Sequence, residues 1–332
     1  MESLKQNIVN RIIPILDKAG MYYRIFARVK TKESIKKKLD LKGNEYRQKG
    51  KKMQDIIGIR IVFYFQEDVG IFYERLKNED GYDRNCESNS LKDLKEYSDI
   101  ISSWDDEPSD NKTKLKRLLP FHDKVFMPER LNIVMKMNSQ EKDYLNSSLQ
   151  YYVNDVDLID STYEVQLRTV FSEGWHEIEH DLRYKTKDEG WWNYCGEESR
   201  MLNGIYASLE TNEKALSQMI QEITYKNYKN KSWDAMIRFH FRIRMNEEKL
   251  PKELCEILDK DERTAKDILH ITKKELSTWL WELSNRIPLS TQLILFLINR
   301  KRLSNSNISN SESASIKMIL DNISQKTVSI PK

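Results

Sequence analysis

The chain has 332 residues, a length that favours two domains. Its 39% hydrophobic and 32% charged content indicate a soluble globular protein, and a net charge of only +3 argues against an extended nucleic-acid-binding surface. No apolar run approaches the ~18 residues needed to span a bilayer, and residues 1–16 lack the basic start and long apolar stretch of a signal peptide. The three cysteines stand far apart and outside CxxC pairs, which predicts a reducing cytoplasm and no zinc site.

The N-terminal part of the chain predicts a helix, a strand and a basic helix. Residues 3–18 have an amphipathic helical pattern that ends near Gly20. The segment MYYRIFARVK then alternates between an apolar and a basic face, as a strand does. A lysine-rich helix is expected from Thr31 to about Arg47. Positive charge is concentrated within residues 28–52, where the cluster as a whole fits a polyphosphate or a nucleic-acid backbone.

Three later segments predict strands with polar groups on one face. DIIGIRIVFYF begins at Asp55, RLNIVMKM covers residues 130–137, and STYEVQLRTV covers residues 161–170. Further helices are expected at 68–78, 171–185 and 197–225, with a polar excursion at 79–120. The predicted fold class is α+β: a mixed β-sheet flanked by helices, covered on its apolar side and open to a ligand on its polar side.

Residues 226–332 predict an all-α C-terminal domain that is separate from residues 1–225. The polar segment YKNYKNKS, which begins at Tyr225, resembles a linker. Helical patterns follow at 233–245, 250–258, 262–280 and 288–300. Their amphipathic spacing is typical of a packed core, so we expect a regulatory or partner-binding module without chemistry of its own. The last thirty residues are rich in Ser and Asn and are expected to be partly disordered.

Charged residues gather in three ordered motifs, FARVKTKESIKKKL from Phe26, DIIGIR from Asp55, and YEVQLRTVFSEGWHEIEHDLRYK from Tyr163. Two separated carboxylates with a cluster of cations are what metal-assisted phosphoryl or pyrophosphoryl transfer requires. Together the motifs resemble the synthetase domain of the RelA/SpoT family over roughly residues 1–225. Enzymes of that family transfer pyrophosphate from ATP to the ribose 3′-hydroxyl of a guanine nucleotide and make the alarmone (p)ppGpp.

The resemblance implies roles for the residues that would bind ATP. Asp55 is expected to bind Mg²⁺, because a hard cation prefers oxygen ligands, and its alternative role is to cap or turn the chain before a strand. Glu164 matches an acid that the family requires for transfer, either as a second Mg²⁺ ligand or as the base that activates the acceptor hydroxyl. Arg28 and Arg60 match arginines that sandwich the adenine ring. Triphosphate contacts are expected from Lys30, Ser34 and Lys38, with Lys36 and Lys37 as alternatives to Lys38.

The acceptor half departs from the family. The family's acceptor loop usually reads close to GYRSxH, with a tyrosine that stacks on guanine, whereas this chain has FHDKVFMPERLNIVMKM from Phe121. Phe126 is therefore the expected replacement for that tyrosine. For His180, ordering of the helix face from Glu177 to Lys185 is an equally good alternative. The acceptor-binding candidates are Lys124, Phe126, Arg130, Asn132, Gln166, Arg168 and His180.

The leading prediction is a cytoplasmic, Mg²⁺-dependent pyrophosphokinase that uses ATP and a guanine nucleotide, GTP or GDP. ATP or ADP and the 3′ end of tRNA stay open as acceptors, the last as in toxic small synthetases of the family. A catalytically silent nucleotide- or RNA-binding regulator is the alternative outside enzymes. No membrane contact is expected, while a homo-oligomer and a regulatory partner at the C-terminal domain stay open.

Overall fold

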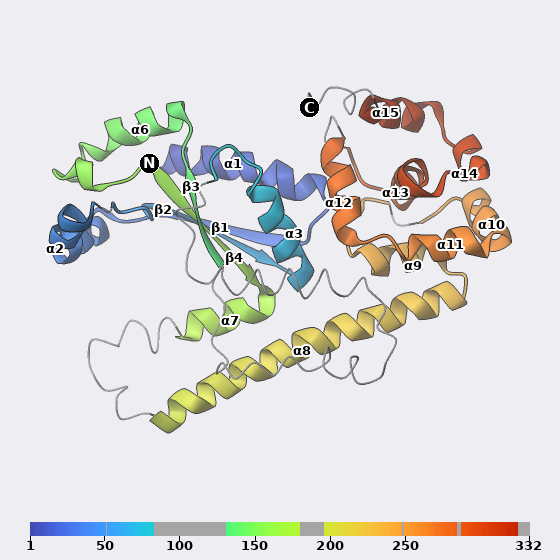
Figure 1. Ribbon diagram of the computed structural model, residues 1–332, viewed down its shortest axis with the longest axis horizontal. Coiled ribbons are helices and arrows are strands. Elements are labelled where there is room, and N and C mark those ends of the chain that lie inside the picture. The colour runs from blue at the N-terminus through green and yellow to red at the C-terminus, as the bar shows by residue number, and fades with distance from the viewer. Residues whose placement is uncertain (51, 83–130, 180–195, 248, 284–286, 325–332) are drawn as a thin grey trace. The chain divides into compact units, whose positions relative to one another are not determined.

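The computed structural model describes residues 1–50, 52–82, 131–179, 196–247, 249–283 and 287–324, and it contains a four-stranded sheet (Figure 1). The strand order is β1-β2-β4-β3. Strand β4 pairs in parallel with β2 and antiparallel with β3, so the predicted mixed sheet is confirmed. The strands are β1 (Tyr23–Val29), β2 (Ile57–Phe63), β3 (Leu131–Lys136) and β4 (Thr162–Thr169).

The chain divides into two compact units. The first comprises Met1–Val9 and Arg24–Asn212, and the second comprises Asn10–Tyr23 and Glu213–Lys332. Helices α1 (Glu2–Lys18) and α8 (Gly196–Lys229) each contribute to both units. The other helices of the first unit are α2 (Lys32–Lys49), α3 (Gln66–Leu76), α6 (Ser139–Leu149), the 3₁₀ turn η2 (Val156–Leu158) and α7 (Val170–Glu179).

The sheet of the first unit has one buried face and one polar face. Ile57, Ile59 and Ile61 alternate along β2 and are buried, as the period of two in a strand requires. The next residue on that face, Phe63, packs against Phe72 of α3 with 5.6 Å between ring centroids. Helices α6 and α7 lie on opposite sides of the sheet (Figure 1). The alternation of residues along the strands therefore correctly predicts which face of the sheet is buried and which is polar.

The second unit is all-α, as predicted. Its core gathers around α13, whose residues from Leu293 to Ile298 are all buried. In the described part of the chain, no helix has both the length and the apolar character needed to cross a membrane. The elements of this unit are α9 (Trp233–Phe241), α10 (Lys252–Lys260), α11 (Glu262–Ile268), α12 (Lys273–Glu282), α13 (Thr291–Ile298), the π-helical turn η6 (Asn299–Leu303), α14 (Ser306–Asn310) and α15 (Ala314–Ser324).

Two local expectations for this region differ from the structure. The predicted linker is helical through Lys229, so the expected domain boundary at 225/226 falls inside α8. The helix expected at 262–280 is two helices, because Thr272 caps α12 in a reciprocal capping box with Glu275. In the tail expected to be partly disordered, α14 and α15 extend to Ser324, and residues 325–332 lie outside the described residues.

The end of α1 is built into the helical unit. Lys18 Nζ donates to the Trp281 carbonyl (2.8 Å), and Trp281 Nε1 donates to the Ile15 carbonyl (2.9 Å). The backbone N–H of Arg244 donates to the Gly20 carbonyl (2.7 Å). The helical unit is therefore not made by the C-terminal segment alone, and it includes the residues directly before β1.

Gly20→Ala is expected to destabilise the second unit by roughly 1–3 kcal/mol, because it combines backbone strain with overpacking. Gly20 has φ +64°, and a Cβ there would lie 2.7 Å from Leu289 Cδ1. Gly50→Ala is the matched control, since Gly50 has φ +62° but no atom within 4 Å of the added Cβ. Urea denaturation of both variants checks this. Equal losses of unfolding free energy would mean that the contact with Leu289 does not matter.

Candidate active site

The strand register brings polar side chains from three strands into rows on one face of the sheet. Arg60 of β2 stands beside Gln166 of β4, and Gln166 stands beside Asn132 of β3. Glu164 of β4 stands beside Gly58 of β2. These positions are half-buried and alternate with fully buried ones. Residues separated by more than a hundred positions in the sequence therefore form one polar surface, which we call the ligand face.

Gly58 lies on the ligand face between Arg28 and Glu164. A Cβ placed on Gly58 would lie 3.7 Å from Arg28 Nε, so the Arg28 side chain lies against this glycine. Gly58 and Arg60 are two residues apart and share a face of β2. Arg28 and Arg60 are thus diagonal neighbours on adjacent strands, a separation that long side chains can bridge. The predicted pair of arginines is brought together on one face.

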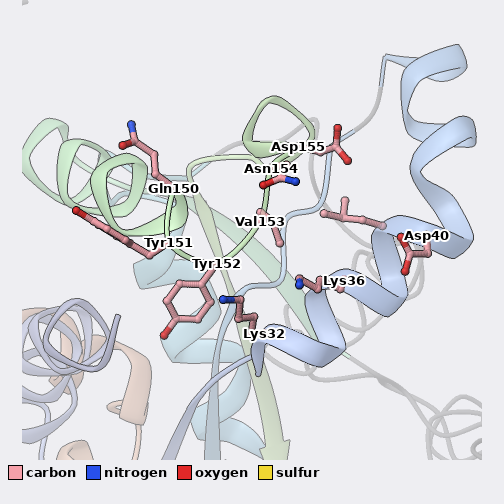
Figure 2. Close-up of a pocket in the computed structure, with 10 residues that line it drawn as sticks. Lys32, Lys36, Asp40, Gln150, Tyr151, Tyr152, Val153, Asn154 and Asp155 are labelled. Atoms are coloured by element: carbon pink, nitrogen blue, oxygen red, sulfur yellow. The ribbon is translucent and has the colours of Figure 1, made fainter.

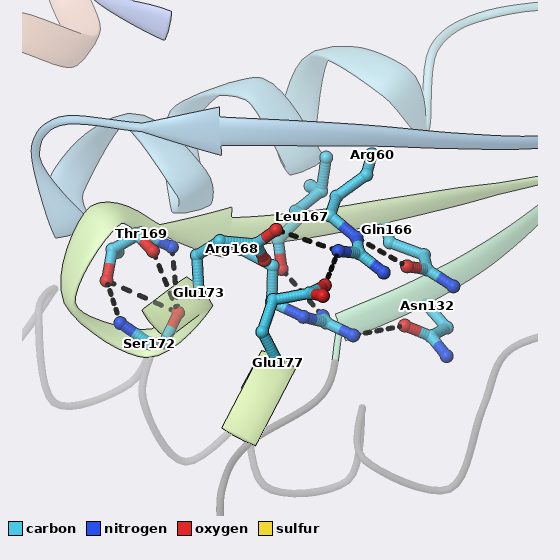
Figure 3. A network of polar contacts seen from close by, with 9 residues as sticks. All are labelled: Arg60, Asn132, Gln166, Leu167, Arg168, Thr169, Ser172, Glu173 and Glu177. Atoms are coloured by element: carbon cyan, nitrogen blue, oxygen red, sulfur yellow. Dashed lines mark hydrogen bonds and ion pairs between the residues drawn. The ribbon is translucent and has the colours of Figure 1, made fainter. Parts of the chain in front are cut away.

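Arg60 is the centre of a continuous polar network, which Figure 3 shows. Its Nε donates to Gln166 Oε1 (3.1 Å), and its Nη1 donates to Glu173 Oε1 (2.8 Å) and to Glu177 Oε1. Gln166 in turn donates through Nε2 to Glu164 Oε2 (2.8 Å). The network therefore links the candidate catalytic carboxylate of Glu164 to the candidate base-binding guanidinium.

A tight turn between β4 and α7 places the two acids of α7 over the ligand face. Thr169 N–H donates to Ser172 Oγ (2.9 Å), and Ser172 N–H donates to Thr169 Oγ1 (3.2 Å), which starts the helix directly after the strand (Figure 3). Glu173 and Glu177 are four residues apart and so share one face of the helix. The site prediction missed both residues, although this spacing directly after a strand was a signal that could have found them.

The charge of Arg60 is compensated within the protein. Burial disfavours its charged form, but the hydrogen bonds to Glu173 and Glu177 outweigh burial and raise the pKa of the guanidinium above its ordinary value. Two carboxylates thus face one cation. This arrangement suits Arg60 poorly as an anchor for a triphosphate, and well as a flat surface for a ring.

Asp55 forms a second cluster with two lysines. Lys38 Nζ donates to Asp55 Oδ1 and Oδ2, both at 2.8 Å, and Lys30 Nζ also donates to Oδ2. The segment before β2 is fixed by its neighbours, since Met53 N–H donates to the Leu158 carbonyl (2.8 Å). The predicted triphosphate-binding lysines and the predicted metal ligand therefore lie together.

The three members of the Asp55 cluster respond differently to burial. Burial opposes ionisation of Asp55, but the hydrogen bonds from Lys30 and Lys38 outweigh it and hold the pKa of the carboxyl below its usual range. Burial lowers the pKa of the Lys30 ammonium, with Asp55 acting against the shift. For Lys38 burial is outweighed by Asp55, and the pKa rises. The pairs keep Asp55 ionised at neutral pH, which a metal ligand requires.

The N-terminus of α2 lies directly after Lys30. Thr31 caps the helix by accepting from Ser34 N–H (3.2 Å), and its hydroxyl donates to Ser34 Oγ (3.0 Å). Ser34 is exposed in the first turn. A helix N-terminus favours anions through its free N–H groups and its dipole. The predicted phosphate contact of Ser34 therefore lies in the first turn of α2, four residues after Lys30 in the chain.

The two candidate metal ligands belong to different clusters. Glu164 lies beside Gly58, which is three residues after Asp55 in the chain, whereas Asp55 itself precedes β2. Asp55 bonds to lysines, Glu164 bonds to Gln166, and no described contact joins the two carboxylates. Across the described residues, no point gathers three or more His, Cys, Asp or Glu side chains. Both carboxylates still offer the oxygen atoms that Mg²⁺ prefers, and Mg²⁺ needs only one or two of them when a substrate supplies phosphates.

A cavity of about 260 Å³ lies elsewhere on the first unit, between α2 and the segment that follows α6 (Figure 2). Lys32, Lys36 and Asp40 line it from α2, and the other wall is residues 150–155. Of the candidate nucleotide-binding residues, only Lys36, an alternative to Lys38, lines this cavity. The candidate site is therefore the ligand face and not this cavity.

The acceptor-binding candidates divide into two groups. Arg168 is buried and donates through Nη2 to Asn132 Oδ1 (3.0 Å), next to the row that contains Gln166. These three residues are therefore brought together beside Arg60. The other candidates, Lys124, Phe126, Arg130 and His180, lie outside the described residues.

Comparison with known proteins matches part of this chain to a known family. Residues 27–189 match the region found in RelA / SpoT proteins. Similar solved structures include a GTP pyrophosphokinase family protein from Streptococcus pneumoniae (18% identity, 67% of this chain and 88% of that chain covered, TM-score 0.41). Others are small alarmone synthetase 2 from Bacillus subtilis (16%, 66% and 93%, TM-score 0.42) and small alarmone synthetase 1 from the same organism bound to its product pppGpp (18%, 67% and 90%, TM-score 0.39). No curated protein sequence matches this chain.

The matched region contains every described element of the ligand face. It begins at Ala27, just before Arg28, and it includes β2, β3, β4 and α7. The three motifs that suggested the resemblance fall within it or begin one residue before it. Residues 27–189 of this chain are therefore a RelA/SpoT region, and the chain is an enzyme of the pyrophosphotransferase class.

Proposed function

We propose that this chain transfers the pyrophosphoryl group of ATP to the 3′-hydroxyl of a guanine nucleotide, GTP or GDP, and so makes (p)ppGpp. The proposal rests chiefly on one observation. The ligand face carries the carboxylate of Glu164 within hydrogen-bond distance of Gln166, which also binds Arg60. The lysine-bound carboxylate of Asp55 lies beside β1 on the same unit. These residues would supply a base-binding part, a phosphate-binding part and a reacting carboxylate within one unit.

ATP is proposed to bind with its base between Arg28 and Arg60. The Arg28 side chain lies against Gly58, which shares a face of β2 with Arg60, and planar guanidinium groups stack well on rings. The triphosphate would then extend toward Lys30 and Lys38 at the start of α2. Ser34 and the free N–H groups of that helix start would complete the phosphate contacts.

Asp55 is the residue proposed to hold Mg²⁺, together with phosphate oxygens of ATP, while Glu164 faces the acceptor. The metal would neutralise charge on the phosphoryl oxygens. Asp55 bonds to Lys30 and Lys38 through both carboxylate oxygens. Since those ammonium groups would move to the phosphates as ATP binds, Asp55 would be released to act as a ligand.

Transfer is proposed to proceed by in-line attack of the acceptor's 3′-oxygen on the β-phosphorus of ATP. The bond from that phosphorus to the oxygen that bridges the α- and β-phosphates breaks, and AMP leaves with this oxygen. Glu164 accepts the proton of the 3′-hydroxyl. Alignment of the two nucleotides and charge neutralisation supply most of the rate. Gln166, by bonding to Glu164 Oε2 (2.8 Å), would keep this carboxylate in place.

The acceptor is decided by one experiment. The protein is incubated with Mg²⁺ and ATP labelled in its terminal phosphate, together with GTP, GDP, unlabelled ATP or tRNA in separate reactions. Label in a guanine nucleotide supports the proposal. Label in tRNA alone would assign the chain to the toxin class. ATP binding without transfer to any acceptor would favour the silent nucleotide-binding regulator.

Arg28→Lys is expected to weaken ATP binding about tenfold, because an ammonium keeps the charge and loses the stacking plane. Arg47→Lys is the control: Arg47 is an exposed arginine of α2 that forms a surface ion pair with Asp155 (2.7 Å). Isothermal titration with a non-hydrolysable ATP analogue measures both. ATP affinity unchanged in Arg28→Lys would show that Arg28 does not stack on the base.

A further inference from the structure

The hydrogen bonds of Arg60 all lie along the edge of its guanidinium group. A guanidinium is planar, and its N–H donors point outward within that plane. In this chain Nε is bonded to Gln166 from β4, and Nη1 is bonded to Glu173 and Glu177 from α7. Partners on two elements therefore determine how the plane is rotated. Among the described residues, none of the aromatic contacts involves Arg60.

We propose that Glu173 and Glu177 are positioning residues, which act through Arg60 by orienting its guanidinium plane for stacking against the base of the bound nucleotide. This inference rests on the proposed function, because it deepens the assignment of Arg60 to base binding. It adds two residues of α7 that touch neither the base nor the phosphates. Its consequence is specific: both acids should matter for a ligand that has a base, and not for one that has only phosphates.

The burial of Glu173 favours positioning over an incidental ion pair. The side chain of Glu173 is 18% exposed, and its second oxygen, Oε2, is buried without a hydrogen-bond partner among the described residues. A carboxylate in such a place is costly unless a cation compensates it, and Arg60 supplies that cation. The pair is therefore mutually dependent, whereas an exposed ion pair would contribute little.

The second acid restricts rotation about the Arg60 side chain. If only Gln166 accepted from Nε and only Glu173 accepted from Nη1, the guanidinium group could still tilt. Glu177, one turn further along α7, accepts from Nη1 as well and opposes that tilt. Glu177 is 56% exposed, so its own contribution to stability is small. Its contact with Arg60 is then more relevant to orientation than to folding, and Glu177 gives a variant that should fold normally.

The test is a double-mutant cycle read with two ligands. ATP and inorganic tripolyphosphate are titrated into the parent protein, Glu177→Gln, Glu173→Gln/Glu177→Gln and Arg60→Lys, and into the variant that combines all three changes. Arg60→Lys keeps a cation opposite Glu173 but has no plane to orient. Glu45→Gln is the control, since Glu45 is an exposed helix glutamate paired with Lys49 (2.8 Å). Thermal unfolding confirms that each variant is folded.

The expected result is about a tenfold loss of ATP affinity in the double glutamine variant, a smaller loss in Glu177→Gln, and tripolyphosphate affinity within about twofold of the parent. In the Arg60→Lys background the glutamine changes should have no further effect on ATP binding. Equal losses for both ligands, or a loss in the Arg60→Lys background as large as in the parent background, would overturn the inference. A parent protein that binds ATP no better than tripolyphosphate would overturn the ATP assignment itself and this inference with it.

Discussion

Glu164→Gln is expected to lower kcat by about 100-fold or more while ATP affinity changes little. The carboxylate is proposed to accept the proton of the acceptor hydroxyl, and an amide cannot do so at neutral pH. The loss of one preorganised electrostatic contact at a reacting centre typically costs at least this much. Glutamine has nearly the same shape, and its amide oxygen can still accept from Gln166 Nε2, so the network around Arg60 should persist.

The measurement is initial rate with saturating ATP and acceptor, together with the dissociation constant for a non-hydrolysable ATP analogue. Asp143→Asn is the matched control, because Asp143 is an exposed carboxylate of α6 in the same unit. A Glu164→Gln enzyme that keeps more than about a tenth of the parent kcat would exclude Glu164 as the base.

Asp55→Asn is expected to reduce the rate by a similar factor of about 100 and to raise the Mg²⁺ concentration needed for half-maximal rate. The amide oxygen is a far weaker ligand for a hard cation than a carboxylate. The change also removes the anion that pairs with Lys30 and Lys38. Both ammonium groups are then free for phosphate, so ATP binding in the presence of a chelator should be as tight as in the parent, or tighter.

The control for this variant is Asp155→Asn, which breaks the exposed ion pair with Arg47 in the same unit. Rates are measured across a Mg²⁺ titration at fixed ATP, and ATP binding is measured with EDTA present. An unchanged Mg²⁺ dependence in Asp55→Asn would remove Asp55 from the metal site. Weaker ATP binding in EDTA would show that Asp55 supports the lysines and does not compete with phosphate for them.

Local sequence pattern was sufficient for the faces of the sheet. The alternation in MYYRIFARVK and STYEVQLRTV assigns each side chain to a face, because successive residues of a strand point to opposite sides. It therefore predicted that Glu164, Gln166 and Arg168 share a face, and the half-buried Glu164 and Gln166 bear this out. The order of the three motifs along the chain was also sufficient to indicate the family, which the match over residues 27–189 confirms.

Only the tertiary structure decided which residues of different segments meet. Arg60 and Gln166 are 106 residues apart, and nothing in the period of either strand determines their register. Capping by Thr169, whose Oγ1 accepts from Ser172 N–H, sets where α7 begins, and so brings Glu173 and Glu177 to Arg60. The two-residue period of a strand is a local property. Register, by contrast, depends on burial and pairing over the whole sheet.

The set of segments that make up the helical unit was likewise not predictable from local sequence pattern alone. The sequence by itself determined that the C-terminal region is helical, because its apolar residues recur with a helical period. It did not indicate that Asn10–Tyr23 joins that unit, since the pattern of α1 is the same whichever core it packs against. Contacts such as that of Trp281 with Ile15 decided this. Periodicity determines which face of an element is buried, whereas the partner that covers it is chosen by packing between distant segments.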